Sequence, residues 1–148
     1  MTNPDLTFRP IADGEEGGVI ALWQACGLTR PWNDPARDLA FARGKATSEV
    51  LVGVVEKRIV ASAMVGHDGH RGTMYYVSVD PPLRGQGLGR QMVAAAEAWL
   101  KARSVWKVNL LVRQSNEAVL GFYAGIGYEA GTSVQIEKWI DPAKRGDR

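Results

Sequence analysis

The stretch from residue 77 to residue 90 turns an apolar strand, through three glycines, directly into an amphipathic helix. Gly85, Gly87 and Gly89 lack the side chains that would keep a ligand away from the backbone. The first turn of a helix leaves its N–H groups unpaired and partly positive, so this segment predicts a site for an anion such as a phosphate. A tight strand-to-helix turn without any ligand would need the same glycines, and the turn alone does not decide between the two interpretations.

The spacing of the glycines excludes two better-known phosphate motifs. A P-loop places a Lys and then Ser or Thr after its last glycine, whereas Leu88, Gly89 and Arg90 follow Gly87 here. A dinucleotide-binding fingerprint needs three glycines spaced one and two residues apart, with an acidic residue downstream, and that spacing is absent. The motif therefore fits neither class of nucleotide-binding protein.

Two segments together resemble the GNAT superfamily of N-acetyltransferases. Arg84, Gly87 and Gly89 fit the pattern Arg/Gln-x-x-Gly-x-Gly/Ala, which resembles the loop that binds the acetyl-CoA pyrophosphate in that superfamily. Downstream, residues 116–128 resemble the GNAT run of Asn-x-x-Ala or Asn-x-Ala, an aromatic–Tyr pair and Gly-Phe/Tyr. The two motifs stand in the family's order and cover roughly the C-terminal half of the chain. The resemblance implies an acyltransferase that takes its acetyl group from acetyl-CoA.

Composition bounds the class of protein and its partners. With 148 residues and no linker-like tract, we expect one GNAT domain over residues 1–148, with 141–148 as a frayed tail. The 18 basic and 16 acidic residues nearly balance, which gives no reason to expect a nucleic acid as partner. With one cysteine, no signal peptide and no membrane-spanning run, we expect a cytoplasmic protein with no membrane partner and no metal site. That cysteine, Cys26, lies on an apolar helical face and is interpreted as a packed thiol rather than a nucleophile.

Periodicity and turn residues predict the order β-α-α-β-β-β-α-β-α-β-β, which is a mixed α/β architecture. The resemblance implies that these elements form a GNAT-like mixed central sheet of about seven strands, with helices on both faces. Capping residues mark two early helices, Asp13 with Glu16 at the start of one and Asp34-Pro35 at the start of the next. The expected helices are one ending near residue 27, one over 36–45, one after the glycine turn and one over 118–125. The expected strands cover residues 6–11, 50–56, 59–65, 73–80, 108–112, 128–130 and 133–139. The resemblance implies that the fourth and fifth strands splay apart so that the pantetheine arm lies between them.

The resemblance also implies how acetyl-CoA is held. The pyrophosphate is expected to accept hydrogen bonds from the loop, namely from Arg84, Gly85, Gln86, Gly87, Leu88, Gly89 and Arg90. The main chain of Val77 and Val79 is expected to pair with the pantetheine amides as an added strand would. Asn116 is expected to cap the following helix, contact the cofactor, or do both.

Tyr123 matches the position of the GNAT general acid, which also contacts the cofactor. A phenol with a pKa of about 10 can give its proton to a departing thiolate whose conjugate acid has a pKa of about 8.5. A tyrosine packed in the core fits the apolar stripe of this helix as well, and the match to the family favours the catalytic role.

The base that takes a proton from the acceptor amine is not assigned by the sequence. Protein-N-terminus acetyltransferases of this superfamily that share the segment Leu-x-Val-Arg carry Glu at the position of Leu111, and leucine cannot accept a proton. One alternative is a water chain held by main-chain carbonyls of the fourth strand, with accessory groups from Tyr76, Ser78 or Asp80. Another is His67 or His70, because histidine titrates in the useful range.

Two polar and aromatic loops are predicted to set acceptor specificity. The predicted substrate contacts are Arg30, Trp32, Asn33, His67, His70, Arg71 and, on the adjoining strand, Tyr76. Both loops resemble those of a bacterial YpeA-like subgroup of GNAT proteins. Ordinary turn chemistry explains the same residues without a ligand, because Asp34 caps a helix and Asp68-Gly69 closes a hairpin. We hypothesise that Arg30 or Arg71 pairs with a carboxylate on a small amine substrate.

These inferences predict an acetyl-CoA-dependent N-acetyltransferase that acetylates a primary amine of a small molecule by direct attack in a ternary complex. The lack of Glu at Leu111 favours a small-molecule acceptor over the alternative of a protein N-terminus or lysine. A third alternative is a non-catalytic acyl-CoA-binding module, against which the match at Tyr123 speaks. The sequence identifies neither the acceptor amine nor the oligomeric state, a homodimer included.

Overall fold

The computed structural model describes residues 5–145. They fall into two compact units, a first that ends at Asn109 and a second that begins at Leu110. The expectation of one domain over residues 1–148 stays a prediction. Of the expected tail, Pro142–Lys144 form a short 3₁₀ helix, η2, and residues 146–148 lie outside the described residues.

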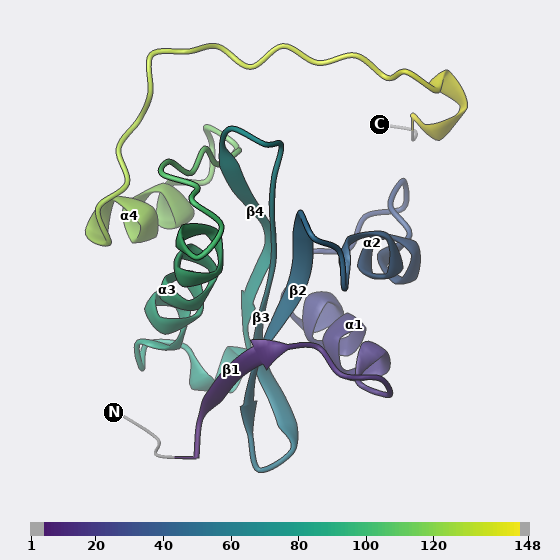
Figure 1. Cartoon of the computed structure of the whole chain (residues 1–148), viewed down its shortest axis with the longest axis vertical. Coiled ribbons are helices and arrows are strands. Elements are labelled where there is room, and N and C mark those ends of the chain that lie inside the picture. The colour runs from purple at the N-terminus through teal and green to yellow at the C-terminus, as the bar shows by residue number, and fades with distance from the viewer. Residues whose placement is uncertain (1–4, 146–148) are drawn as a thin grey trace. The chain divides into compact units, whose positions relative to one another are not determined.

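The first unit is built on an antiparallel sheet with the strand order β1-β2-β3-β4 (Figure 1). Glu56 and Lys57 join the second strand to the third with positive φ angles of 49° and 66°, which is the conformation of a two-residue hairpin turn. The fourth strand lies at an edge of the sheet, so one side of its backbone faces no neighbouring strand of this sheet. The strands are β1 Thr7–Pro10, β2 Ser48–Val55, β3 Arg58–His67 and β4 Gly72–Val79.

Helices cover both faces of this sheet, as the sequence predicts. Figure 1 shows α1 (Glu16–Ala25) and α2 (Pro35–Ala42) on one face and α3 (Leu88–Lys101) on the other. α2 begins as predicted, because the Asp34 carboxylate accepts a hydrogen bond from the N–H of Arg37 at 3.2 Å.

The start of α1 corrects a prediction. The N-cap residue is Glu15 rather than Asp13, and no side chain caps the helix from that position. The Glu15 carboxylate instead accepts a hydrogen bond from the N–H of Ala12 at 2.8 Å and binds Arg9 of β1. These contacts fix the entry of the chain into α1 and tie the helix to the sheet.

The core of the first unit fixes the direction of α3. A Cβ added to Gly72, at the start of β4, would lie 2.7 Å from Cδ1 of Leu100, so only glycine admits this close approach. Leu100 is 1% exposed and lies in the last turn of α3. The C-terminal end of α3 therefore packs against the beginning of β4, and its N-terminal end follows the glycine turn at the other end of that strand.

The sheet has four strands, all antiparallel, rather than the mixed sheet of about seven that the sequence predicts. Residues 108–112 form only one parallel bridge, Gly72 with Val108, and residues 128–130 and 133–139 form no strand. The apolar residues behind the last prediction, such as Val134 and Ile136, are 85% and 92% exposed. A segment becomes a strand only where a neighbour pairs with its backbone and covers its apolar face, and the described part of the second unit contains no such neighbour.

The second unit contains one α-helix in its described residues, α4 (Glu117–Gly125). Asn116 is its N-cap, with the side-chain oxygen accepting a hydrogen bond from the N–H of Val119 at 3.3 Å. The capping role predicted for Asn116 is therefore confirmed. Within residues 5–145, no helix combines the length and the apolar character needed to cross a membrane.

Candidate active site

The glycine turn lies between β4 and α3. A short 3₁₀ helix, η1 (Pro81–Leu83), is followed by Gly85 and Gly87, whose φ angles are +81° and +82°. These left-handed conformations favour glycine over residues that carry a Cβ. A Cβ added to either glycine would meet no atom within 4 Å, so both positions border open space. The glycines thus satisfy the geometry of the turn and also leave its backbone accessible.

The first turn of α3 presents unpaired amides beside this space. Gly87 is the N-cap and has no side chain to accept their hydrogen bonds. In the described chain, the amides of Leu88, Gly89 and Arg90 donate to no protein group. The Leu88 side chain is 8% exposed, so it anchors the helix in the core. Because the dipole of the 14-residue helix adds positive potential at this end, the turn favours an anion.

Arginines strengthen the positive potential of the turn. Arg84 and Arg90 are exposed on either side of the two left-handed glycines, as is Gln86 between them. Exposed guanidinium groups can reach an anion without losing a partner in the protein, and they can bind phosphate oxygens with two N–H groups at once. Unpaired amides and exposed guanidinium groups at this end of α3 are the kinds of donor that a phosphate needs.

A bulge interrupts β4 between its two ends. Ala63 of β3 alone lies opposite two residues of β4, Tyr76 and Val77. Tyr76 has a φ angle of +53°, a left-handed conformation that costs a bulky residue on the order of 1–2 kcal/mol. Bulges release backbone groups from the ladder and occur preferentially next to active sites. The backbone is therefore irregular at two places, in the bulge within β4 and in the glycine turn that follows the strand.

The side chain of Tyr76 is held on the face of the sheet that α1 and α2 cover. Its ring stacks on Trp23 of α1 with 4.0 Å between centroids and 11° between planes. Its hydroxyl donates a hydrogen bond to Oδ2 of Asp38 in α2 at 2.7 Å. Burial, and secondarily the Asp38 carboxylate, raise the pKa of Tyr76 well above its ordinary value, so the phenol stays protonated near neutral pH.

The open edge of β4 continues to the end of the strand. The N–H of Asp80 donates to the carbonyl of Val60 at 2.8 Å. Because successive residues of a strand direct their backbone groups to opposite sides, Val79 directs its N–H and C=O away from β3. Its carbonyl oxygen accepts a hydrogen bond from the thiol of Cys26 at 3.2 Å. The N–H of Val79 is thus directed to the side where the resemblance implies an added strand, whereas its carbonyl oxygen already has the Cys26 thiol as a partner.

The loop between α1 and α2 lies at the same end of the sheet, because Cys26 directly follows α1. The guanidinium of Arg30 donates to the carbonyls of Gly27 at 2.6 Å and Thr29 at 2.9 Å, so it is engaged within its own loop. Trp32 is 37% exposed, and Asn33 is exposed. Two of the three predicted contacts thus present their side chains to solvent, in a loop that starts beside the end of β4.

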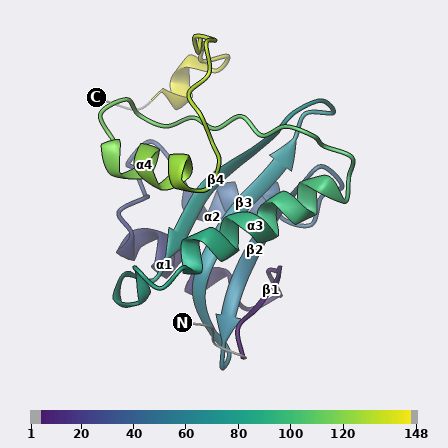
Figure 2. The same cartoon turned by 90° about the vertical axis from the view of Figure 1, so that its left-hand side faces the viewer.

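The second predicted loop lies at the opposite end of the sheet. Figures 1 and 2 show the turn between β3 and β4 beside the C-terminal end of α3, with the glycine turn at the other end of β4. β4 has eight residues, and at about 3.3 Å per residue it separates the two turns by roughly 25 Å. The structure therefore does not bring His67, His70 and Arg71 together with Trp32 or with the glycine turn.

Hydrogen bonds in this second loop are those of an ordinary turn. Oδ1 of Asp68 accepts from the N–H groups of His70 and Arg71 at 2.9 Å and 2.8 Å. Nδ1 of His67 accepts from the N–H of Gly69 at 3.0 Å. The polar residues of this loop thus have a structural explanation that involves no substrate.

Tyr123, the predicted general acid, lies in α4 of the second unit. Its ring packs edge to face against Phe122 and Tyr128, with 5.0 Å and 5.2 Å between ring centroids. Burial raises the pKa of Tyr123 above its ordinary value of 10.0, so the phenol is protonated at neutral pH. Leu111 of the same unit is 56% exposed and offers no group that could accept a proton.

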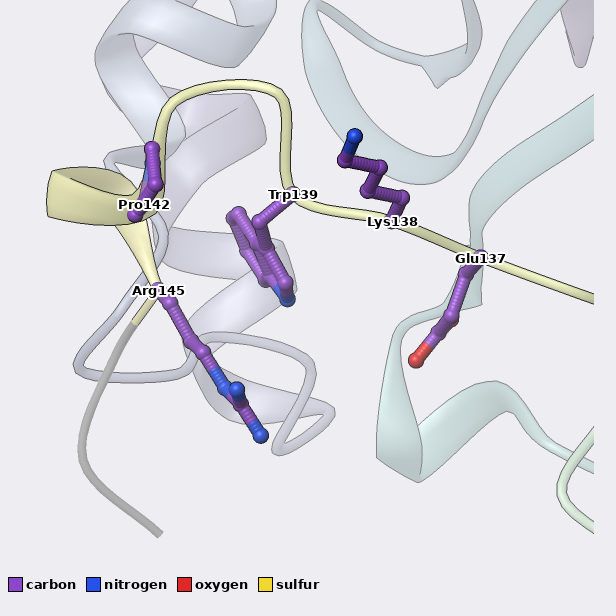
Figure 3. A pocket seen from close by; sticks show the side chains of 5 residues that line it. All are labelled: Glu137, Lys138, Trp139, Pro142 and Arg145. Carbon is purple, nitrogen blue, oxygen red and sulfur yellow. The ribbon is translucent and has the colours of Figure 1, made fainter.

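The second unit also has an open hollow near the end of the described chain. Its lining combines acidic, basic and apolar side chains, shown in Figure 3, and consists of Glu137, Lys138, Trp139, Pro142 and Arg145. The hollow contains none of the predicted site residues.

Sequence reasoning missed two neighbours of the bulge. The sequence around Asp38 indicates only an acidic residue in the first turn of a helix. The sequence around Trp23 indicates only one residue of an apolar helical face. Their contacts with Tyr76 join residues that are 38 and more positions apart. No local pattern signals such a contact, so it emerges only from the fold.

Comparison with known proteins identifies the family. The chain matches the model of the acetyltransferase (GNAT) family over residues 18–128. A protein named acetyltransferase from Yersinia enterocolitica is 41% identical over 127 residues, which covers 86% of this chain and 89% of that protein. The YpeA-like subgroup stays a prediction.

Solved structures show the same fold. A transcriptional regulator from Bacillus halodurans C-125 gives a TM-score of 0.77 at 20% identity, over 90% of this chain and 99% of that one. An aminoglycoside acetyltransferase from an uncultured soil metagenomic sample, in complex with sisomicin, gives a TM-score of 0.73 at 16% identity, over 91% and 95%. At these low sequence identities, structural similarity shows only that the folds are alike. With the family match over residues 18–128, it follows that the chain belongs to the GNAT acetyltransferase family and is an acyltransferase.

Proposed function

We propose that the chain is an acetyl-CoA-dependent N-acetyltransferase, which acetylates a primary amine of a small molecule by direct attack in a ternary complex. One observation supports the proposal: the unpaired amides of the first turn of α3 follow the end of β4, a bulged strand whose outer edge faces no neighbouring strand of the sheet. A ligand with a diphosphate and an arm that contains amide groups fits this pair of features. The diphosphate suits the glycine turn, and the amides suit the strand edge.

The residues at the glycine turn fit the diphosphate of acetyl-CoA. The unpaired amides of residues 88–90 can donate hydrogen bonds to phosphate oxygens, and Gly85 and Gly87 keep the approach open. Exposed Arg84 can add a charged hydrogen bond. Along the arm, the main chain of Val77 and Val79 would pair with the pantetheine amides. When bound, acetyl-CoA supplies the acetyl group as a reactive thioester.

Tyr123 is the proposed general acid. Its raised pKa keeps the phenol protonated at neutral pH, so Tyr123 holds a proton that can be given to the departing sulfur. A thiolate that receives this proton cannot return to the carbonyl carbon as a nucleophile. The role is carried over from the family's motif, and its test is the Tyr123→Phe variant described in the Discussion.

The side chains expected to assist the base are already engaged. The carboxylate of Asp80 pairs with Arg58, and the Tyr76 hydroxyl donates to Asp38. Ser78 is 4% exposed and hydrogen-bonded inside the core. We therefore propose that water, held by main-chain carbonyls near the end of β4, takes the proton from the acceptor amine. An amine with a pKa of about 8 needs far less assistance than a lysine with a pKa of about 10.4, which favours a weakly basic acceptor.

Acceptor recognition is proposed for Trp32 and Asn33. Both are exposed in the loop at the glycine-turn end of the sheet, whereas Arg30 is engaged with carbonyls of its own loop. Arg71 lies at the far end of β4, so the hypothesis that it pairs with a substrate carboxylate is dropped. An exposed indole with a neighbouring amide can pack against an apolar or sugar-like face and bond one polar group.

Two measurements test the proposed function. Calorimetry with acetyl-CoA should show binding in the micromolar to millimolar range, and free CoA should compete for the same site. A panel of primary amines, including amino acids, amino sugars and short peptides with free N-termini, should then show thiol release with at least one small amine. Binding without turnover of any amine would favour the non-catalytic module. Turnover confined to the peptides would favour a protein acceptor, and no binding by folded protein would refute the proposal.

A further inference from the structure

We propose that Asp38 and Tyr76 are positioning residues, which hold the bulge of β4 in the conformation that turnover requires. The proposal rests on the proposed function, because the bulge lies on the strand that is proposed to receive the pantetheine arm. The hydrogen bond of 2.7 Å from the Tyr76 hydroxyl to Oδ2 of Asp38 joins this strand to α2. Nothing in the reaction as proposed needs this phenol as an acid or a base.

The backbone of Tyr76 is strained, so it needs support from its surroundings. An aromatic residue at a φ angle of +53° stays there only where neighbouring groups over-determine its position. The stack on Trp23 fixes the plane of the ring, and the hydrogen bond to Asp38 fixes its hydroxyl end. Together the two contacts hold the side chain at both its face and its tip.

The indole beneath the Tyr76 ring is itself immobilised. Nε1 of Trp23 donates to Oγ of Ser62 at 2.8 Å, and Oγ of Ser62 lies 2.9 Å from Oγ of Ser78. Trp23 and Ser62 are 0% exposed, and Ser78 is 4% exposed. Ser62 and Ser78 are the strand pair that directly adjoins the bulge. The stack therefore rests on a rigid buried network, and the contact that can be removed with the least disturbance of the core is the one to Asp38.

Asp38 also links the bulge to the acceptor side of the proposed site. It lies in the first turn of α2, directly after the loop that holds Trp32 and Asn33. The glycine turn, in contrast, is shaped by the left-handed backbone of Gly85 and Gly87, and the hydrogen bond and the ring stack of Tyr76 do not involve it. Loss of the hydrogen bond should therefore lower kcat, and any loss of CoA affinity through the main chain of Val77 in the bulge should be smaller than the loss of kcat.

The test compares Asp38→Ala, Asp38→Asn and Tyr76→Phe, with Arg37→Ala as the matched control. Asp38→Ala and Tyr76→Phe should each lower kcat about tenfold, because a small displacement of reacting groups costs this much or more. Asp38→Asn keeps an oxygen that can accept the phenol hydrogen, so its kcat should stay within about threefold of the wild-type value. Arg37 is exposed beside Asp38 and does not contact Tyr76, so Arg37→Ala should leave kcat unchanged.

Three further readouts separate positioning from other roles. The Kd for CoA should change less than kcat in every variant, because the glycine turn is left intact, and the pH profile of kcat should keep its shape. The double variant with Asp38→Ala and Tyr76→Phe should be no slower than either single variant, because both remove one interaction. Tyr76→Phe keeps the ring on Trp23, so it decides the question if Asp38→Ala fails to fold.

Several results would overturn the proposal. Wild-type kcat in folded Tyr76→Phe would show that the hydrogen bond is irrelevant to turnover. An Asp38→Asn variant as slow as Asp38→Ala, with a lost limb in the pH profile, would assign proton transfer to the pair instead. If the wild-type protein binds no acetyl-CoA, the proposed function itself fails. Normal wild-type turnover with unaffected variants refutes only the positioning role.

Discussion

The thiol of Cys26 donates a hydrogen bond to the main-chain carbonyl of Val79 at 3.2 Å, joining the end of α1 to the end of β4. The sulfur is thus a donor to the backbone in a half-buried place, which is the behaviour of a packed thiol. The same contact places the only cysteine of the chain beside the strand edge proposed for pantetheine.

Direct attack in a ternary complex predicts that Cys26 is dispensable for the chemistry. The Cys26→Ser variant keeps a donor toward Val79, so we expect kcat within about twofold of the wild-type value. Intact-mass spectrometry after incubation with acetyl-CoA alone should show no acetylated protein. An acetyl group on Cys26, together with an inactive Cys26→Ser variant, would indicate a covalent intermediate and contradict direct attack.

Gly87→Ala and Gly69→Ala form a matched pair of variants. Their φ angles are +82° and +87°, and a Cβ at either position would meet no atom within 4 Å. Both should lose about 1–2 kcal/mol of unfolding free energy, measured in urea, because alanine disfavours this conformation. Only Gly87→Ala should also weaken acetyl-CoA binding, by about tenfold in calorimetry. Equal affinities of the two variants for acetyl-CoA would show that the glycine turn is not part of the binding site.

The contact between Gly72 and Leu100 predicts a compensating pair of substitutions. Gly72→Ala places a methyl group 2.7 Å from Leu100 Cδ1, and this overpacking should cost about 1–3 kcal/mol. Leu100→Ala should cost about 2–5 kcal/mol through the cavity it leaves. The double variant should lose less than the sum of the two, because the added methyl group enters that cavity. Urea unfolding of all four proteins measures the coupling, and strict additivity would speak against the close approach.

The lowered pKa of Glu15 should make the free energy of unfolding depend on pH in the acidic range. Its hydrogen bond with Arg9, the largest cause, lowers the pKa of Glu15 from 4.5 to about 2. A carboxyl group whose pKa is lowered by folding adds stability above about pH 4.5, and this contribution is lost as the pH falls toward 2. Arg9 is 39% exposed, so the expected contribution is modest, about 1 kcal/mol.

The control for Glu15→Gln is Glu129→Gln, which removes the same charge from an exposed site. Urea midpoints should fall less steeply between pH 5 and pH 3 in Glu15→Gln than in the wild type or the control. Parallel pH curves for all three proteins would contradict the role of the ion pair.

The raised pKa of Tyr123 predicts the alkaline side of the activity profile. Because the acid is active when protonated and its pKa exceeds 10.0, kcat should show no alkaline decline below about pH 10. Tyr123→Phe should lower kcat by about 100-fold or more, with little change in the Kd for CoA. Leu120→Ala, at an exposed position of the same helix, serves as a control and should keep the wild-type profile. A Tyr123→Phe variant with normal kcat would refute the assignment.

Local sequence signals predicted much of the first unit and the start of the helix in the second. Asp34-Pro35 marks the start of α2, and the glycines at 85 and 87 mark the turn before α3, because capping and left-handed backbone depend on residues close in sequence. Asn116 marks the start of α4 for the same reason.

Other features depend on contacts that no local pattern records. The bulge at Tyr76 arises from a mismatch between two strands, and its support comes from Asp38, 38 positions away. The alternation in residues 133–139 is typical of a strand, but a strand also needs a partner, and alternation cannot tell whether one is present. The two loops predicted to bind the acceptor are both polar and aromatic in sequence. Only the topology of the sheet shows that β4 separates them.

The open side of β4 has a further consequence for the protein in solution. Unpaired main-chain groups along an edge strand are the usual starting point for aggregation between copies of a protein. The outer backbone edge of β4, which is proposed to receive the cofactor arm, is an edge of this kind. Cofactor binding and aggregation would thus use the same backbone groups. Storage with CoA should therefore slow the formation of insoluble material.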